Sequence, residues 1–339
     1  MLCNPIKAAG LIVLLALLAV SASPNVSRAQ SGTLPTGYTA QVIAHGLVGP
    51  NHLAYGPDSA LYVTQLNGGE NDGNGQVVRI MPDGTAQAVL NHLMKPTGLA
   101  WAGNDLYIVS ANNVVVSHVQ DGKFSDPTVV FANLPFNGRS NGQIALGPDG
   151  MLYFQSTGTE GAPHDSGFIY TAKPGSTTLS VYARGFKNAY AFAWESKSGT
   201  FYATEIGDGD IPGVGQPPEK LNVIKQNADY GWPTCYANRL PNPVWQGSTE
   251  QCAKVEAPLA MFAPEATPTG LAFFDGQLIV ALWNGNPARL VSVNPQTGVV
   301  SEWTRIFKNP LALLTDKDGS LLVVDFLDGT ITRISKVIS

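Results

Sequence analysis

The sequence has little charge and little cysteine, and each shortage excludes some classes of protein. Only 13% of the 339 residues are charged and the net charge is −5, which argues against nucleic-acid binding because that needs a basic stripe. The five histidines show no metal-ligand spacing, and no serine nucleophile elbow or glycine-rich phosphate loop is evident. No amphipathic helical period follows the N-terminus, while the 36 glycines and 24 prolines indicate a loop-rich, all-β body.

A phrase that recurs about every 45 residues determines the expected architecture. Each copy has an entry marked by proline or glycine, a short apolar run, a tight turn and a second apolar run. Successive copies are separated by 46, 45, 48, 79 and 42 residues, measured between Leu53, Leu99, Ile144, Phe192, Leu271 and Leu313. Six copies, each long enough for four short strands, predict a six-bladed β-propeller. The long interval predicts an insertion between the fourth and fifth blade cores, at about residues 207–262.

The N-terminus differs in composition from the repeats. Lys7 precedes an apolar stretch over residues 8–22, and small residues near Ala29 suit a cleavage site. This pattern predicts a signal peptide over residues 1–29, a propeller over residues 30–339 and a secreted or periplasmic location. An uncleaved membrane anchor is the alternative, and nothing else in the chain suggests a membrane. Export leaves Cys235 and Cys252, and a pair of cysteines in an oxidising compartment predicts a disulfide inside the insertion.

Four phrases in the second half carry a family resemblance. They are Gly185-Phe186-Lys187-Asn188, Glu205-x-Gly207, Leu221-Asn222-Val223-Ile224 and Tyr230-Gly231-Trp232-Pro233. Together they resemble the glucose/sorbosone dehydrogenase family, and the likeness spans most of residues 40–336. The resemblance implies a secreted six-bladed propeller that oxidises a sugar, or a sugar-derived alcohol or aldehyde, with pyrroloquinoline quinone (PQQ) and calcium. The expected partner is a small sugar-like substrate, and the oligomeric state is left open.

The resemblance also suggests which residues hold the cofactors. Lys187 and Asn188 are expected to bind the quinone, Trp283 to stack on a flat ligand and Arg289 to pair with a cofactor carboxylate. The calcium ligands are expected among the acids of one region, because calcium prefers oxygen donors: Glu205, Asp208, Asp210 and Glu219. Structural alternatives stand beside these roles, namely an exposed loop lysine, a turn asparagine, a core tryptophan, an ion-paired arginine and a solvated acidic turn.

The general base is a point of departure from the family pattern. The family places a histidine shortly before the Gly-Pro-Asp-Gly turn of the third blade, whereas residues 130–145 contain none. The matching position is Arg139 or Ser140. Arginine cannot accept a proton at ordinary pH, so Arg139 is expected to bind a ligand carboxylate or to form a structural ion pair. His164, next to Asp165, is the other candidate, which would supply a base from another segment.

Two further functions remain open at this point. One is a propeller that has lost catalysis and binds a sugar or peptide over the channel. The other is a calcium-dependent, lactonase-like hydrolase, for which polar residues at blade entries would hold the metal. The sequence offers Asn51, Asn141, Asn188 and Glu205 for that role.

Overall fold

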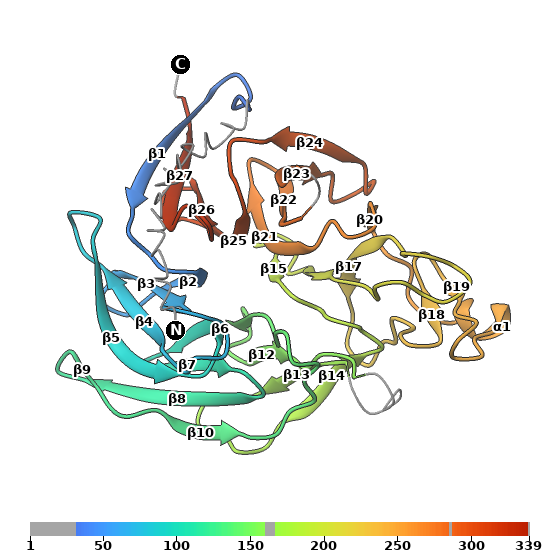
Figure 1. Ribbon diagram of the computed structural model, residues 1–339, viewed down its shortest axis with the longest axis horizontal. Helices are drawn as coiled ribbons and strands as arrows, with labels where there is room; N and C mark the ends of the chain where they lie inside the picture. The colour runs from blue at the N-terminus through green and yellow to red at the C-terminus, as the bar shows by residue number, and fades with distance from the viewer. Residues whose placement is uncertain (1–31, 160–166, 285–286, 338–339) are drawn as a thin grey trace, which may run out of the picture.

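The computed structural model describes residues 32–159, 167–284 and 287–337 (Figure 1). Across these ranges the chain forms 27 strands and one short helix, α1 (Thr249–Cys252). Six sheets, each with four main strands, are arranged in a ring, so the predicted all-β class and six-bladed propeller are confirmed. The predicted signal peptide and the domain boundary at residue 30 lie outside the described residues and stay predictions.

The first three blades follow the chain in order. Blade one contains β2 (Pro50–Tyr55), β3 (Leu61–Gln65), β4 (Gly75–Ile80) and β5 (Ala86–Leu93). Blade two contains β6 (Pro96–Ala102), β7 (Asp105–Ser110), β8 (Asn113–Gln120) and β10 (Thr128–Phe131), with β9 (Lys123–Phe124) paired to β8. Blade three contains β11 (Ile144–Leu146), β12 (Leu152–Gln155), β13 (Phe168–Ala172) and β14 (Ser180–Arg184).

The other three blades complete the ring. Blade four contains β15 (Phe192–Trp194), β16 (Phe201–Glu205), β17 (Glu219–Ile224) and β20 (Ala260–Phe262). Blade five contains β21 (Pro268–Phe274), β22 (Gln277–Leu282), β23 (Arg289–Val293) and β24 (Val300–Thr304). Blade six contains β25 (Pro310–Thr315), β26 (Leu321–Asp325), β27 (Thr330–Lys336) and, from the other end of the chain, β1 (Tyr38–Ala44).

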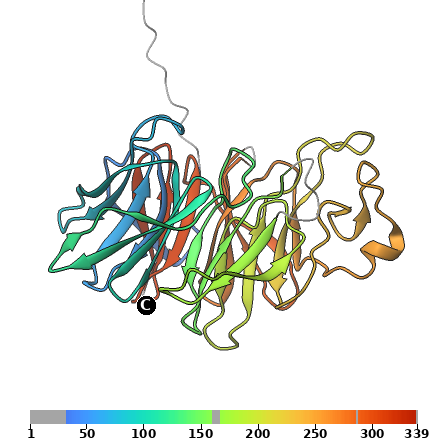
Figure 2. The same ribbon diagram turned by 90° about the horizontal axis from the view of Figure 1, so that it is seen from below.

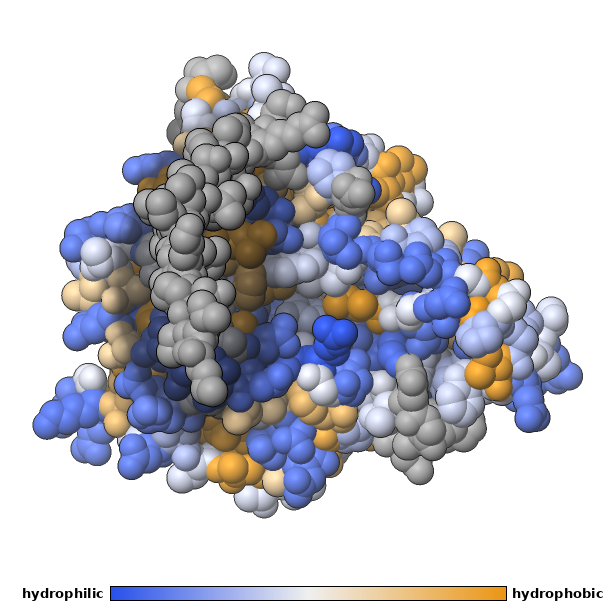
Figure 3. Space-filling model, viewed as in Figure 1, coloured by the Kyte–Doolittle hydropathy of each residue, from blue (hydrophilic) through white to orange (hydrophobic). Residues whose placement is uncertain are grey.

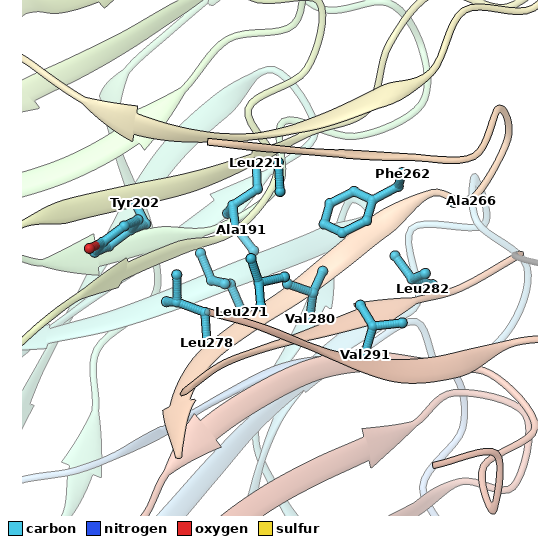
Figure 4. Packing of buried hydrophobic residues seen from close by; sticks show 12 residues of the cluster. Ala191, Tyr202, Leu221, Phe262, Ala266, Leu271, Leu278, Val280, Leu282 and Val291 are labelled. Atoms are coloured by element: carbon cyan, nitrogen blue, oxygen red, sulfur yellow. The ribbon is translucent and has the colours of Figure 1, made fainter. Parts of the chain in front are cut away.

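The blades are held together by strands that are apolar on both faces. In β26 every residue is buried, and alternate side chains point to opposite faces of the sheet. Leu322 and Val324 pack in a cluster with Leu53 of blade one, whereas Leu321 and Val323 pack with residues of blade five. Figure 4 shows the same arrangement one interface further round, where residues of blades four and five form a shared core.

The predicted insertion between the fourth and fifth blades is not confirmed. Residues 206–218 form the connection between β16 and β17, and Glu219–Ile224 is a regular third strand of blade four. The additional residues lie inside blade four, where residues 225–259 separate β17 from β20. We call residues 225–259 the blade-four insertion. It contains β18 (Cys235–Tyr236), β19 (Leu240–Pro241) and α1, and it projects sideways from the ring (Figures 1 and 2).

The predicted disulfide between Cys235 and Cys252 is confirmed. Cys252 is the last residue of α1, whose first turn is capped by Ser248 in a reciprocal bond with Gln251. The disulfide therefore links this capped turn to the first half of the insertion. None of the helices in the described ranges is long and apolar enough to cross a membrane.

We predict that replacing both cysteines, C235A/C252A, lowers the free energy of unfolding by about 3 kcal/mol. The reason is that the two cysteines are 17 residues apart, and a crosslink over such a loop restricts the unfolded chain. Calorimetry of the oxidised wild type and the double variant measures the difference. Equal melting temperatures would contradict a stabilising role for the bond, and wild type treated with a reductant serves as the matched control.

Candidate functional site

A cavity of about 940 Å³ opens among the six blades. Its wall is built from the entries of first strands, such as Asn51 and Thr97, and from loops between second and third strands, such as the one carrying Gly207. First strands of neighbouring blades contact one another around the ring axis, so each blade contributes a short piece of this wall. Hydrophilic residues cover much of the face seen in Figure 3, with smaller hydrophobic areas between them.

The cavity wall is rich in cations and amides. Lys95, Arg139 and Lys187 line it together with one carboxylate, Glu70. Four asparagines add amide groups to the wall: Asn51, Asn137, Asn188 and Asn284. The protein as a whole has a net charge of −5, yet the described wall carries more positive than negative groups. Such a wall suits a ligand that carries carboxylates or carbonyl oxygens.

Lys187 and Asn188, which the sequence analysis singled out, both lie on this wall. Both lie in the connection between β14 and β15, and hydrogen bonds fix their backbone. The carbonyl of Lys187 accepts from the backbone N–H of Gly158 at 2.6 Å, and the carbonyl of Asn188 accepts from Ile206 at 2.9 Å. The side-chain oxygen of Asn188 also accepts from Gln155 Nε2 at 2.5 Å. The segment is therefore preorganised by its neighbours in blades three and four.

Glu205 supports this segment from behind the wall. Its side chain is buried, and Oε1 accepts from the backbone N–H of Lys187 at 3.1 Å. Oε2 lies 2.9 Å from Lys220 Nζ and accepts from Asn222 Nδ2 at 3.0 Å. A buried carboxylate needs such partners, because an unpaired charge is very unfavourable in the interior. Glu205 is not among the cavity-lining residues.

The other three predicted calcium ligands lie in different surroundings. Asp208 is partly buried, with Oδ1 lying 3.4 Å from Lys187 Nζ, and Asp210 is exposed on the same loop. Glu219 is buried and accepts hydrogen bonds from the backbone N–H groups of Thr267 and Gly207, both of which line the cavity. In the described part of the chain, no three His, Cys, Asp or Glu side chains form a cluster that could hold a metal. The calcium role of these four acids stays a prediction.

The remaining predicted residues divide between the cavity and its surroundings. Arg139 and Trp283 line the cavity, and Trp283 packs edge-on against Phe326 with ring centroids 4.9 Å apart. Arg289 begins β23, its Nη1 donates to the carbonyl of Pro287 at 3.0 Å, and it is not among the lining residues. His164 lies outside the described residues, so its proposed role is not addressed.

Two functional candidates were missed by the sequence reasoning. Lys95 is buried, and its Nζ contacts Glu70 Oε2 at 3.1 Å and the carbonyl of Gly138 at 3.0 Å. It immediately precedes Pro96-Thr97-Gly98, the phrase that opens blade two, so the repeat could have placed it at the cavity. Glu70 lies in a glycine- and asparagine-rich loop between β3 and β4, and nothing in its local sequence distinguishes it from a solvated loop residue.

Comparison with known proteins supports the family resemblance. The family model described as Glucose / Sorbosone dehydrogenase matches residues 159–289, so the resemblance seen in the sequence is confirmed over less than half of the chain. None of the curated proteins matches the chain in sequence.

Several solved structures share the propeller. An oxidoreductase described as a glucose dehydrogenase from Thermus thermophilus is 21% identical, with a TM-score of 0.70, 88% of this chain covered and 100% of the other. The PQQ-bound aldose sugar dehydrogenase of Streptomyces coelicolor is 21% identical, with a TM-score of 0.67 and coverage of 89% and 100%. The holo PQQ domain of pyranose dehydrogenase from Coprinopsis cinerea is 14% identical, with a TM-score of 0.70 and coverage of 91% and 97%. At these identities the likeness shows the fold, which this chain shares with sugar dehydrogenases.

Glu219 gives the site region a specific pH dependence. Burial raises the pKa of this carboxyl to about 7, against 4.5 for an ordinary glutamate, although the N–H groups of Thr267 and Gly207 lower it in part. Between these two values the folded protein binds more protons than the unfolded chain. The contribution of protonated Glu219 to the free energy of unfolding is therefore fully present below pH 4.5 and is lost as the pH rises through about 7.

We predict that E219Q removes this loss. Relative to wild type, the variant should gain up to about 3 kcal/mol of unfolding free energy when the pH is raised from about 4.5 to about 8, since a pKa shift of one unit corresponds to about 1.4 kcal/mol. Denaturant titrations of both proteins across this range measure the difference. A constant difference at every pH would contradict the raised pKa of Glu219.

Proposed function

We propose that the protein is an oxidoreductase that binds PQQ and calcium in the central cavity and oxidises a sugar, or a sugar-derived alcohol or aldehyde. The observation that carries the proposal is the cavity of about 940 Å³, whose wall combines cations with amides. Its volume is in the range of small-molecule and cofactor sites. Lys187, Asn188 and Trp283 of this wall lie in the segment that matches the dehydrogenase family model.

The residues present fit a planar, anionic quinone. Lys187 and Arg139 would bind its carboxylates, Asn188 would donate to a carbonyl or carboxylate oxygen, and Trp283 offers an aromatic edge or face. For calcium, Asp208 is the predicted acid placed between the lining residues Gly207 and Gly209, and backbone carbonyls of the same loop would complete an oxygen-donor set. Glu205 and Glu219 support this region by their hydrogen bonds to Lys187 and Gly207.

When bound, PQQ with calcium would supply the chemistry of hydride acceptance from a substrate C–H bond. Lys187 and Asn188 orient the reactants, since their backbone is fixed by hydrogen bonds to Gly158 and Ile206. A guanidinium does not serve as a base in proteins, so Arg139 would bind an anionic group. Glu70 is the one carboxylate among the described lining residues, and we assign it the substrate hydroxyl proton.

A secreted or periplasmic location is part of the proposal. The signal-like N-terminal sequence supports it, and so does the disulfide between Cys235 and Cys252, because such bonds persist in oxidising compartments. The proposed substrate is a small sugar-like molecule.

We predict that PQQ with calcium raises the melting temperature of the mature apoprotein by a few degrees. A ligand present at about 100 times its dissociation constant adds about 2.7 kcal/mol to the stability of the folded state. K187M should reduce the shift, because the variant loses a cavity cation. K225M is the matched control, since Lys225 is largely exposed and pairs with Glu256 on the insertion. Thermal unfolding of the three proteins measures the effect.

Other outcomes of this experiment would change the function assigned. A shift with calcium alone would favour a calcium-dependent hydrolase or a binding propeller, and lactone hydrolysis without quinone would decide between them. A flat response to both additions would overturn the cofactor assignment. A shift that K187M and K225M preserve equally would show binding elsewhere.

We further predict that E70Q lowers kcat of the quinone-loaded protein about 100-fold or more, the usual contribution of a general base. The affinity for PQQ should change little, because the variant keeps a hydrogen-bonding side chain beside Lys95. Dye-coupled turnover and quinone titration measure the two quantities separately. E250Q, on the exposed surface of α1, is the control. Unchanged turnover of E70Q would remove Glu70 from the reaction.

A further inference from the structure

Lys95 connects loops from two different parts of the cavity wall. Its side chain is buried, and Nζ donates to Glu70 Oε2 at 3.1 Å and to the carbonyl oxygen of Gly138 at 3.0 Å. Glu70 belongs to residues 66–74, which connect β3 to β4 in blade one, and we call this segment the Glu70 loop. Gly138 belongs to residues 132–143, which lead from blade two into blade three, and we call this segment the Arg139 loop. One ammonium group therefore joins two loops that lie far apart in the chain.

The other contacts at the tip of the Glu70 loop are local. The backbone N–H of Gly69 donates to Asp72 Oδ2 at 2.7 Å, and the N–H of Asp72 donates to the carbonyl of Gly69 at 3.2 Å. The side chain of Glu70 is 57% exposed, and among the described residues its only ion pair is with Lys95. Lys95 is therefore the contact that attaches the tip of this loop to the cavity wall.

The Arg139 loop is held by a bond beside its arginine. The N–H of Asn137 donates to Thr157 Oγ1 at 2.8 Å, and the N–H of Arg139 donates to Asn137 Oδ1 at 3.0 Å. Between these two residues, the carbonyl of Gly138 accepts from Lys95. This bond fixes the peptide unit that joins Gly138 to Arg139, and thus the point from which the guanidinium side chain extends.

The backbone of Lys95 is strained. Its φ of +44° lies in the left-handed region that residues other than glycine rarely adopt, and the following Pro96 favours extended backbone at this position. The carbonyl of Lys95 accepts from the N–H of Ala111 at 3.3 Å, which helps to hold this conformation. Burial of the ammonium also requires partners for its charge. Strained residues of this kind persist where the surrounding structure determines them, and they cluster at functional sites.

The ion pair distinguishes the two oxygens of Glu70. Oε2 is engaged by the ammonium, whereas Oε1 accepts no hydrogen bond from the part of the chain that the structure describes. Oε1 is therefore the carboxylate oxygen that can meet a ligand. Lys95, Glu70 and Arg139 all line the cavity, so one buried cation holds an acid and a second cation at set positions on the same wall.

We propose that Lys95 is a positioning residue that holds Glu70 and Arg139 in a fixed arrangement at the cavity wall. It acts through its bond to the Glu70 carboxylate and its bond to the peptide before Arg139, and no contact with the reacting atoms is assigned to it. The inference rests on the proposed function only for the roles of Glu70 in proton transfer and of Arg139 in anion binding.

The first test uses the apoprotein and needs no quinone. K95M keeps an unbranched side chain beside Phe136 and removes the ammonium. Amide hydrogen exchange, measured by mass spectrometry after rapid mixing, should become at least about tenfold faster in both the Glu70 loop and the Arg139 loop, because both lose a hydrogen bond to a charged group. Exchange in β7 of blade two should not change. K225M is the control and should match wild type throughout.

E70A separates the two contacts of Lys95. It removes an exposed side chain and leaves the bond to Gly138, so exchange should rise in the Glu70 loop alone. Unchanged exchange of that loop in E70A would overturn the proposal, and so would a rise in only one loop, or in neither, in K95M. A rise in β7 without a rise in both loops would show that Lys95 merely supports blade two, which also overturns the proposal.

The second test uses the quinone-loaded protein. K95M should lower kcat at least about tenfold, because it misplaces Glu70, and should weaken the affinity for PQQ severalfold, because it loosens the Arg139 loop. Since Lys95 acts on turnover through Glu70, kcat of K95M/E70Q should be no lower than that of E70Q. The affinity of the double variant for PQQ should match that of K95M. A kcat lowered by the product of the two single effects would show that Lys95 acts directly in the reaction, and would overturn the positioning role.

The two tests separate the two proposals. If PQQ binds none of the proteins but hydrogen exchange follows the expected order, the proposed function fails and the positioning role of Lys95 stands. If wild type binds PQQ and turns over substrate, and K95M matches it in exchange, kcat and affinity, the proposed function stands and the role of Lys95 is overturned.

Discussion

The structure depends on the pairing of β1 with β27, which joins the two ends of the chain in blade six. Tyr38 lies opposite Lys336 and Val42 opposite Thr332, so the N-terminal strand becomes the outer strand of the last sheet. Each blade buries apolar side chains on both faces, as β26 does toward blades one and five. A ring left open would expose two such faces to water. Because the cavity wall takes residues from all six blades, closure is also the condition for the site.

Within the closed ring, a buried ion pair connects the fold to the cavity. Glu205 and Lys220 lie opposite each other on adjacent strands β16 and β17. The carboxylate also binds the backbone of Lys187, so the pair that satisfies two buried charges fixes the segment that lines the cavity. Replacing only Glu205 or only Lys220 would leave an uncompensated charge in the interior. This would destabilise the folded protein far more than replacing both residues. Glu219 and Lys220, the first two residues of β17, thus both have partners from other segments.

The sequence was sufficient to predict the ring, and it singled out three residues that lie on the cavity wall. Leu53, Leu99 and Ile144 are repeat positions and lie in first strands, and the same periodicity brings Lys187, Asn188 and Trp283 to the cavity. The insertion predicted at about residues 207–262 is not confirmed, because that range includes the regular strand Glu219–Ile224. This strand begins with two charged residues that give no strand signal, although both are buried beside partners from elsewhere. Glu70 was missed for a related reason. Its position on the wall follows from a contact with Lys95, 25 residues away, which no local pattern encodes.

Charge pairing also explains why the presence of a lysine in the sequence does not by itself predict a ligand-binding cation. Lys95 lies beside Glu70, Lys187 beside Asp208 and Lys220 beside Glu205, so each of these cations has an acid within ion-pair distance. In the described ranges no acid lies within ion-pair distance of the Arg139 guanidinium. The surplus positive charge of the wall therefore resides at Arg139, and an anionic ligand gains most by meeting it. Lys187 lies on the same wall with its ammonium 3.4 Å from Asp208, which also accepts a hydrogen bond from Trp232, so the blade-four insertion and the ring meet at this part of the wall.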